Sequence, residues 1–215
     1  MAEHFLNLGD TVIGCARSEA TLQHPNYQHY TADLTEAVDV AAMMSAIRHE
    51  QRSLDVLINN AAVAMMGASA LQPPAVARKM IDLNLCSLIH VTHDAIRLLR
   101  SASSPRVLNL TSVAVPLRLE GEAVYSATKA AVEQWTRVLA RELGPMGITV
   151  NAIGPAPTDT DLLRGVAREK LEDLVANQAI SRWTTMADIM HATEFFLHPA
   201  SDMITGQVLY LGGAG

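Results

Sequence analysis

Three residues near the middle of the chain have the types and spacing of an acid–base group. Tyr125 and Lys129 are four positions apart, so on a helix both side chains lie on one face and the ammonium can approach the phenol. A free phenol loses its proton near pH ~10, and an adjacent cation lowers that pKa by stabilising the phenolate. We therefore expect Tyr125 to donate or accept a proton at neutral pH. Ser112 can donate a hydrogen bond to an oxygen on which charge develops.

The elements that must position these residues alternate between strand and helix. Residues 107–129 predict a buried strand, then a turn, a loop and a helix that opens at Tyr125. The expected strands are 11–15, 27–32, 56–59, 107–110, 148–153 and 207–211. The expected helices are 2–8, 37–48, 74–100, 123–143, 162–176 and 186–197. Such alternation is typical of a parallel sheet covered on both faces, so we predict one doubly wound α/β domain over residues 1–215.

Length and charge exclude several classes of protein. The 215 residues suit one domain, and the sequence has no run of eighteen apolar residues that could span a membrane. The opening MAEHFLNLGD lacks the basic region of a signal peptide. A formal net charge of −6 argues against nucleic acid and anionic membranes as partners. Cys15 and Cys86 lie in apolar segments, as reduced thiols do, so we expect a cytoplasmic protein.

Ser112, thirteen residues before a Y-x-x-x-K pattern, resembles the short-chain dehydrogenase/reductase family. An exposed Tyr–Lys pair on a helix gives the same pattern, so the other family marks decide. Residues 57–62, LINNAA, are similar to the family's N-N-A-G stretch, and 147–155, GITVNAIGP, to the strand that leads to the nicotinamide. Residues 204–213, ITGQVLYLGG, are similar to the family's last strand and double glycine. The resemblance implies a Rossmann-type fold with Asn84, Ser112, Tyr125 and Lys129 as catalytic residues.

The resemblance also implies a nicotinamide cofactor. Ala16 stands where the family has an acid that selects NAD, and Arg17 follows it, so we expect NADP(H) rather than NAD. Arg17 can equally be a solvated loop arginine. The full set of cofactor-binding residues that the resemblance implies is Arg17, Asp33, Leu34, Asn60, Ala61, Tyr125, Lys129, Pro155, Thr158 and Thr160.

Several polar residues allow more than one interpretation. Asp33 borders the adenine in relatives and can also cap the following helix. Asn84 kinks its helix in relatives and holds a water of the proton relay from the lysine, although a polar surface residue is the alternative. His90 and His93 are one turn apart, but without a third ligand we expect no metal.

The resemblance fails at the beginning of the chain. Relatives start with a strand and a T-G-x-x-x-G-x-G turn that holds the pyrophosphate on a helix N-terminus. Aligned on residues 9–12, GDTV, Met1 falls inside the first helix, so we expect a domain truncated at its N-terminus. Either the natural start lies upstream or this chain binds cofactor poorly. We expect residues 1–50 to be loosely attached or re-paired and 54–215 to keep the family core.

Two functions remain open at this point. The first is an NADP(H)-dependent oxidoreductase that interconverts a ketone and a secondary alcohol with Tyr125 as acid and base. The alternative is a non-redox binding or regulatory protein of the same fold. β-Ketoacyl carrier-protein reductases are the nearest resemblance, so the small-molecule substrate is either free or carrier-bound. We expect an apolar pocket, which Val113, Val115, Leu117, Met65 and Met66 would line.

The resemblance further implies a homo-oligomer joined through residues 74–100, 123–143 and 207–211. The two long helices there carry apolar residues beyond one core-facing stripe. These residues are Leu98, Leu99, Trp135, Val138 and Leu139.

Overall fold

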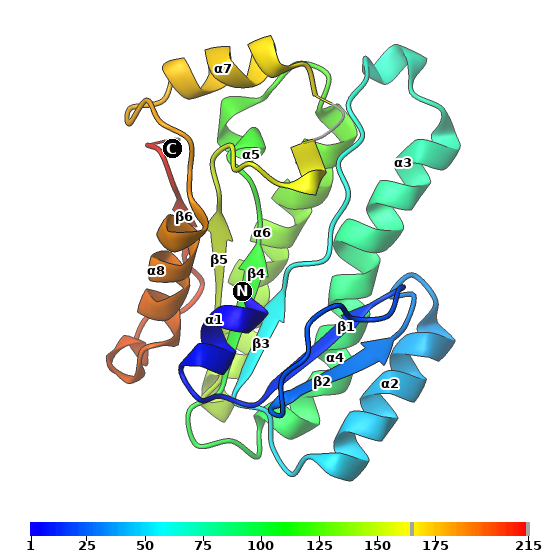
Figure 1. Ribbon diagram of the computed structural model, residues 1–215, viewed down its shortest axis with the longest axis vertical. Helices are drawn as coiled ribbons and strands as arrows, with labels where there is room; N and C mark the ends of the chain where they lie inside the picture. Colours follow the sequence, from blue (N-terminus) through cyan, green and yellow to red (C-terminus); the bar gives the residue numbers. More distant parts are fainter. Residues whose placement is uncertain (164–165, 214–215) are drawn as a thin grey trace.

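The computed structural model describes residues 1–163 and 166–213 and has a three-layer α/β architecture (Figure 1). Its strands are β1 (Val12–Ala16), β2 (Tyr27–Thr31), β3 (Val56–Asn59), β4 (Arg106–Leu110), β5 (Thr149–Gly154) and β6 (Val208–Tyr210). Its α-helices are α1 (Ala2–Asn7), α2 (Ala37–Glu50), α3 (Pro74–Ile81), α4 (Ser87–Leu99), α5 (Ala114–Leu117), α6 (Ala123–Leu143), α7 (Arg168–Ala176) and α8 (Met186–Leu197). All described strand pairs are parallel, which confirms the predicted fold class.

The strands form two separate sheets. A four-stranded sheet has the order β3-β4-β5-β6, and β1 and β2 pair only with each other, with Val12 opposite Tyr27. Within the described residues, no strand joins β1 to β3. Ile13 of β1 and Leu57 of β3 nevertheless pack against one hydrophobic cluster, which also contains Met44 of α2 and Leu99 of α4. Side-chain packing through α2 and α4 therefore attaches the N-terminal strands, with no backbone pairing to the larger sheet.

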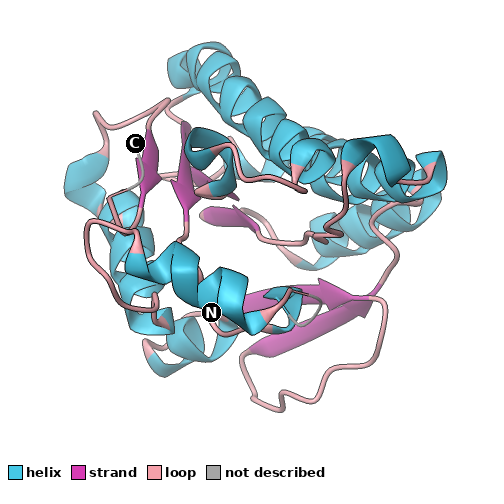
Figure 2. Cartoon of the chain, turned by 90° about the horizontal axis from the view of Figure 1, so that it is seen from above, coloured by secondary structure: helices cyan, strands magenta, loops and turns pink. Residues whose placement is uncertain are grey.

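Alternation along β4 and β5 builds a core on each face of the larger sheet. Val107 and Val150 pack with residues of α4 and α6, whereas Leu108 and Ile153 pack with Phe196 of α8. Successive side chains of a strand point to opposite faces, so each strand contributes to both cores. Figure 2 shows the resulting layers from above, with the two-stranded sheet apart from the four-stranded one.

A chain of polar side chains crosses the first of these cores. The Asn59 amide donates to Thr92 Oγ1 at 3.0 Å and to Asn109 Oδ1 at 2.8 Å. Asn109 in turn donates to Thr136 Oγ1 at 2.8 Å. Buried amides must be hydrogen-bonded, and here each is satisfied by a neighbour from another element. The chain therefore joins α4, β3, β4 and α6, as expected for an asparagine that ends a buried strand.

Several expected helices differ from those observed. The helix expected over residues 74–100 is interrupted by a π-helical turn, Asp82–Cys86, between α3 and α4. In the stretch expected as a helix over 162–176, a 3₁₀ turn spans Asp161–Leu163 and α7 begins only at Arg168; residues 164–165 lie outside the described ranges. The short helix α5 was not expected at all.

Most of the apolar residues that were expected to lie in an oligomer interface are instead part of the core, so for them the argument is wrong. Leu98, Leu99 and Leu139 are buried in the core, and Trp135 packs partly against it. Only Val138 of that set is exposed, at 45%.

None of the described helices combines the length and apolarity needed to cross a membrane.

Candidate active site

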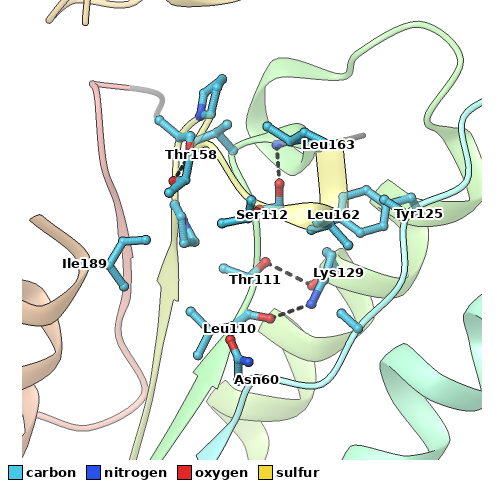
Figure 3. A pocket seen from close by; sticks show the side chains of 18 of the residues that line it. Asn60, Leu110, Thr111, Ser112, Tyr125, Lys129, Thr158, Leu162, Leu163 and Ile189 are labelled. Carbon is cyan, nitrogen blue, oxygen red and sulfur yellow. Dashed lines mark hydrogen bonds between the residues drawn. The ribbon is translucent and has the colours of Figure 1, made fainter. Parts of the chain in front are cut away.

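A cavity of about 620 Å³ opens at the carboxyl ends of β3, β4 and β5. Figure 3 shows Asn60, Ser112, Tyr125, Lys129 and Thr158 around it; Tyr125 and Lys129 come from α6, and the other three come from separate segments. The carboxyl ends of parallel strands meet at one edge of a sheet, which explains how residues far apart in sequence converge there. Within the described residues, the structure places all three residues of the expected acid–base group in this cavity wall.

Tyr125 and Lys129 lie on one face of α6, as their spacing predicts, and both are almost fully buried. The Lys129 ammonium lies 5.9 Å from the centre of the Tyr125 ring. Its Nζ donates a hydrogen bond to the Leu110 carbonyl at 2.7 Å. Burial disfavours the charged form of a lysine, and it lowers the pKa of Lys129 to about 8.

The expected lowering of the Tyr125 pKa is not observed in this structure. Burial of the phenol raises the pKa of Tyr125 to about 12, because a phenolate would lose its hydration. Hydrogen bonding with Ser112 acts in the opposite direction, and the negative charge of Glu122 raises the pKa further. The Lys129 ammonium is directed to the Leu110 carbonyl, and its charge does not offset the effect of burial on the pKa of the phenol. Tyr125 is therefore a protonated donor at neutral pH.

Ser112 follows β4 and precedes the short helix α5. Its Oγ accepts a hydrogen bond from the Ala114 N–H at 3.2 Å, which fixes the side chain at the start of this turn. The Ser126 hydroxyl donates to the Ala114 carbonyl at 3.1 Å and holds α5 against α6. The Ala114 N–H uses one of the two lone pairs of the Ser112 oxygen, so the hydroxyl proton can be donated to Tyr125 or to a substrate oxygen in the cavity.

Asn84 does not line the cavity, but its hydrogen bonds hold together the segments that form the cavity wall. It is 1% exposed within the π-helical turn, and its amide donates to the Val63 carbonyl at 2.9 Å and to Thr128 Oγ1 at 3.1 Å. The Val63 N–H donates back to Asn84 Oδ1 at 2.8 Å. The interruption of the helix agrees with the expected kink. The side chain binds Val63 and Thr128 and makes no hydrogen bond to Lys129, so its part in a proton relay stays a prediction.

Other expected cofactor-binding residues share the cavity wall. Asn60, Ala61, Pro155, Thr158 and Thr160 all line it. The Thr158 hydroxyl donates to the Ala156 carbonyl at 2.9 Å, which closes the turn after β5.

Arg17, Asp33 and Leu34 lie outside this cavity, at the carboxyl ends of the smaller sheet. Asp33 Oδ1 accepts hydrogen bonds from the N–H and the hydroxyl of Thr35, and these bonds lower the pKa of the Asp33 carboxyl. Arg17 is near enough to add to that lowering. Leu34 packs against the core cluster of α2 and α4. Asp33 therefore stabilises its own turn and does not cap α2, whose N-cap residue is Glu36, so the helix-cap interpretation is wrong. Its place beside the adenine stays a prediction.

The substrate side of the cavity was only partly expected. Val113 lines it, but Val115, Leu117, Met65 and Met66 do not, because α5 and the loop after β3 direct them elsewhere. The amphipathic segment over residues 162–176, expected to cover the substrate, contributes Leu163, Val166, Leu171 and Leu174. The unexpected lining residues are Met1, Ala2, Ala64, Leu119, Glu122, Met186 and Ile189. The helix expected over 186–197 was the available signal for the last two, and none existed for Glu122.

Behind the acid–base group lies a buried carboxylate. Glu133 Oε1 accepts hydrogen bonds from the Thr111 hydroxyl at 2.8 Å and from the Tyr210 hydroxyl at 2.5 Å. Arg137 Nη2 lies 3.7 Å from its other oxygen. Glu133 follows Lys129 by one helical turn, so it secures β4 and β6 to α6 directly behind the cavity.

The cavity thus combines a buried lysine (Lys129), a protonated tyrosine (Tyr125) and a serine hydroxyl (Ser112) at the strand ends of a doubly wound sheet. This arrangement defines an acid–base site for carbonyl chemistry. The model of the family described as enoyl-(acyl carrier protein) reductase matches residues 1–213. The chain belongs to the short-chain dehydrogenase/reductase family of oxidoreductases.

Relatives support the same grouping. A 3-oxoacyl-(acyl-carrier-protein) reductase of Vibrio cholerae is 27% identical over 219 residues, which cover 99% of this chain and 90% of the relative. A 3alpha-hydroxysteroid dehydrogenase of Mediterraneibacter gnavus is 30% identical over 184 residues, 84% of this chain and 72% of the relative. The crystal structure of the 3-ketoacyl-(acyl-carrier-protein) reductase from Brucella melitensis, complexed with NADH, superposes with a TM-score of 0.90 at 26% identity, over 99% of this chain and 90% of that chain.

Proposed function

We propose that this protein catalyses the reversible, NADP(H)-dependent reduction of a ketone to a secondary alcohol, with Tyr125 as the proton donor. The observation that carries the proposal is the convergence of Tyr125, Ser112 and buried Lys129 on one cavity wall. The relatives described above, a 3-oxoacyl-(acyl-carrier-protein) reductase and a 3alpha-hydroxysteroid dehydrogenase, support the same reaction class.

The cavity residues fit the nicotinamide end of such a cofactor. Asn60 and Lys129 offer polar donors to a ribose, and the Thr158 backbone and Thr160 offer partners to an amide. When bound, the nicotinamide supplies or accepts a hydride at the carbonyl carbon. For the adenosine end we assign Arg17 to the 2′-phosphate, because it directly follows β1, where the fold presents the ribose, and its charge suits NADP(H) over NAD.

In the direction of reduction, Ser112 donates a hydrogen bond to the substrate carbonyl and so polarises it. Tyr125 transfers its proton to the same oxygen as negative charge develops there. Its raised pKa keeps this proton in place until the carbonyl oxygen becomes more basic. Lys129 stabilises the phenolate formed at that moment, and Asn84 and Glu133 hold the surrounding wall rigid.

The direct test is to follow NADPH and NADH absorbance with a panel of ketones and β-oxoacyl thioesters at neutral pH. Turnover with NADPH and at least one ketone is expected, and a carrier-bound thioester is a substrate to compare with the free ketones. Absence of turnover with every ketone and both cofactors, in a protein shown to be folded, would contradict the proposal.

We also propose that the protein is a homo-oligomer. The surface residues that support this are Val138 of α6, Leu209 of β6 and Phe195 of α8, which remain exposed apolar side chains on the folded chain. Light scattering at micromolar concentration should give a mass of at least twice 23.2 kDa. A mass of one chain would refute the proposal.

A further inference from the structure

An acidic side chain lies in the otherwise apolar part of the cavity wall. Glu122 precedes Tyr125 by three residues and is half-buried. Leu119 and Ala64 line the same wall, and Met186 and Ile189 of α8 face the same cavity. Glu122 is the only acidic side chain among the lining residues that the structure describes. Partial burial raises the pKa of its carboxyl, as expected for an acid that has lost part of its hydration.

The fold makes no use of this carboxylate. Glu122 occupies the N-cap position of α6, where an acidic side chain commonly accepts a hydrogen bond from the first helical turn, but it makes no such bond. Its backbone carbonyl accepts from the Ser126 N–H at 2.7 Å, so the main chain is satisfied. None of the described side chains donates to the carboxylate oxygens. A half-buried carboxylate without a protein donor is stabilised by a hydrogen bond from a donor group that enters the cavity.

Its place relative to Tyr125 limits where that donor can be. Glu122 lies at the N-cap of α6, three residues before Tyr125, and both side chains line the same cavity. The Glu122 charge acts on the Tyr125 phenol strongly enough to raise its pKa. A substrate whose carbonyl oxygen contacts Tyr125 therefore presents the next few atoms of its body to Glu122.

We propose that Glu122 is the specificity-determining residue of the cavity and accepts a hydrogen bond from a hydroxyl or amino group carried by the substrate a few atoms from the reacting carbonyl. The same charge disfavours a carboxylate at that position. The apolar wall formed by Leu119 and its neighbours contacts the remainder of the substrate. This inference rests on the proposed function and adds to it a substrate class, the hydroxy or amino ketones.

The test compares isosteric ketones with the full chain and saturating NADPH. The parent is pentan-2-one, and two isosteres replace its terminal methyl by a hydroxyl or an amino group; levulinate supplies a carboxylate at the same end. In the wild-type protein, kcat/KM for the hydroxyl or amino isostere should exceed that for pentan-2-one, and levulinate should be the poorest substrate. A preference for only the amino compound would identify a cation as the recognised group, and a preference for both would identify any donor.

Glu122→Gln should lower the preference for the favoured isostere over pentan-2-one by about 5- to 30-fold, because the charged acceptor is replaced by a neutral amide oxygen that forms a weaker hydrogen bond. The same variant should raise kcat/KM for levulinate, a gain that a merely damaged fold cannot produce. Glu120→Gln is the matched control, since Glu120 is exposed in the same loop and does not line the cavity.

Equal preferences in the wild-type protein and Glu122→Gln, with no gain for levulinate, would overturn the inference and leave the proposed function intact. Failure to reduce any of these four compounds, in a protein that turns over another member of the ketone and thioester panel, would overturn the inference alone. Absence of turnover with the whole panel and both cofactors would overturn the proposed function, and the inference with it.

Discussion

The Lys129 ammonium lies against the Leu110 carbonyl, with 2.7 Å between Nζ and the oxygen, at the last residue of β4. This bond orients the lysine, and burial lowers its pKa to about 8. The proton that Lys129 carries is therefore lost within reach of ordinary assay conditions, while Tyr125, with its pKa at about 12, stays protonated.

The rate of ketone reduction should consequently fall as the pH rises through about 8. Below that value Lys129 is protonated and can stabilise the Tyr125 phenolate formed in the reaction; above it the charge is gone and the barrier rises. The measurement is kcat/KM for reduction from pH 6.5 to 10, which should decline with one apparent pKa. A profile that stays level over that range would show that the Lys129 charge has no part in the step.

Tyr125→Phe should lower carbonyl reduction by roughly 10²–10⁴-fold, because it removes only the transferable proton. Binding of NADPH, followed by fluorescence, should persist. Tyr30→Phe is the control, since the Tyr30 hydroxyl bonds Glu50 on the surface and is remote from the cavity. Retention of more than a few per cent of the rate by Tyr125→Phe would remove Tyr125 as the acid.

Arg17→Ala should weaken NADPH by roughly 10- to 100-fold and NADH far less, because it removes a charge-assisted hydrogen bond to the 2′-phosphate. Dissociation constants for both nucleotides provide the measurement. Arg52, another exposed arginine, lies between α2 and β3 and supplies the control variant Arg52→Ala. Equal losses for the two nucleotides would show that Arg17 is a solvated surface residue.

Asn109→Ala should destabilise the fold by about 2–4 kcal/mol, because it leaves a buried N–H of Asn59 without its acceptor and opens a small cavity. Urea unfolding measures this change. Asn26→Ala, at an exposed turn before β2, should change stability by less than about 0.5 kcal/mol. Similar costs for the two variants would mean that the buried amide chain contributes nothing specific.

Amides of β1 and β2 should exchange with solvent much faster than those of β4 and β5. Each N-terminal strand has one partner strand, whereas β4 and β5 are flanked on both sides. Opening β1 thus breaks fewer hydrogen bonds and exposes less core. Mass spectrometry should compare the exchange rates of residues 11–15 and 27–32 with those of residues 107–110 and 148–153. Equal protection in the two sets would disprove the lower stability of the N-terminal strands.

The periodicity of apolar residues in the sequence predicts most of the strands and helices, but only part of the candidate active site. The strands at 56–59 and the helices at 123–143 and 186–197 were predicted at their observed bounds, because long apolar patterns with clear ends leave little choice. The spacing of Tyr125 and Lys129 correctly predicted a shared helix face. It could not predict that Lys129 reaches Leu110, because that depends on where the end of β4 lies relative to α6.

The same limit applies to the residues that the sequence did not identify. Glu122 has no periodic signature, and only the path of the loop after α5 brings it to the cavity. The burial that raises the Tyr125 pKa comes from several segments distant in sequence, whereas spacing along one helix reveals only the nearby lysine. Charge pairs can be read from a sequence, but desolvation is a property of the assembled molecule.

The amide chain from Thr92 to Thr136 also acts as a check on strand alignment. Asn59 lies opposite Asn109 in the parallel pairing of β3 with β4. A shift of β3 by a single residue would turn Asn59 to the opposite face, against the apolar packing beneath α8, and leave Asn109 facing an aliphatic neighbour. Aliphatic strands alone would tolerate such a slip at little cost. Two facing amides do not, because a shifted register would leave both buried amides without their partners, so the observed pairing of β3 with β4 is favoured over its one-residue alternatives.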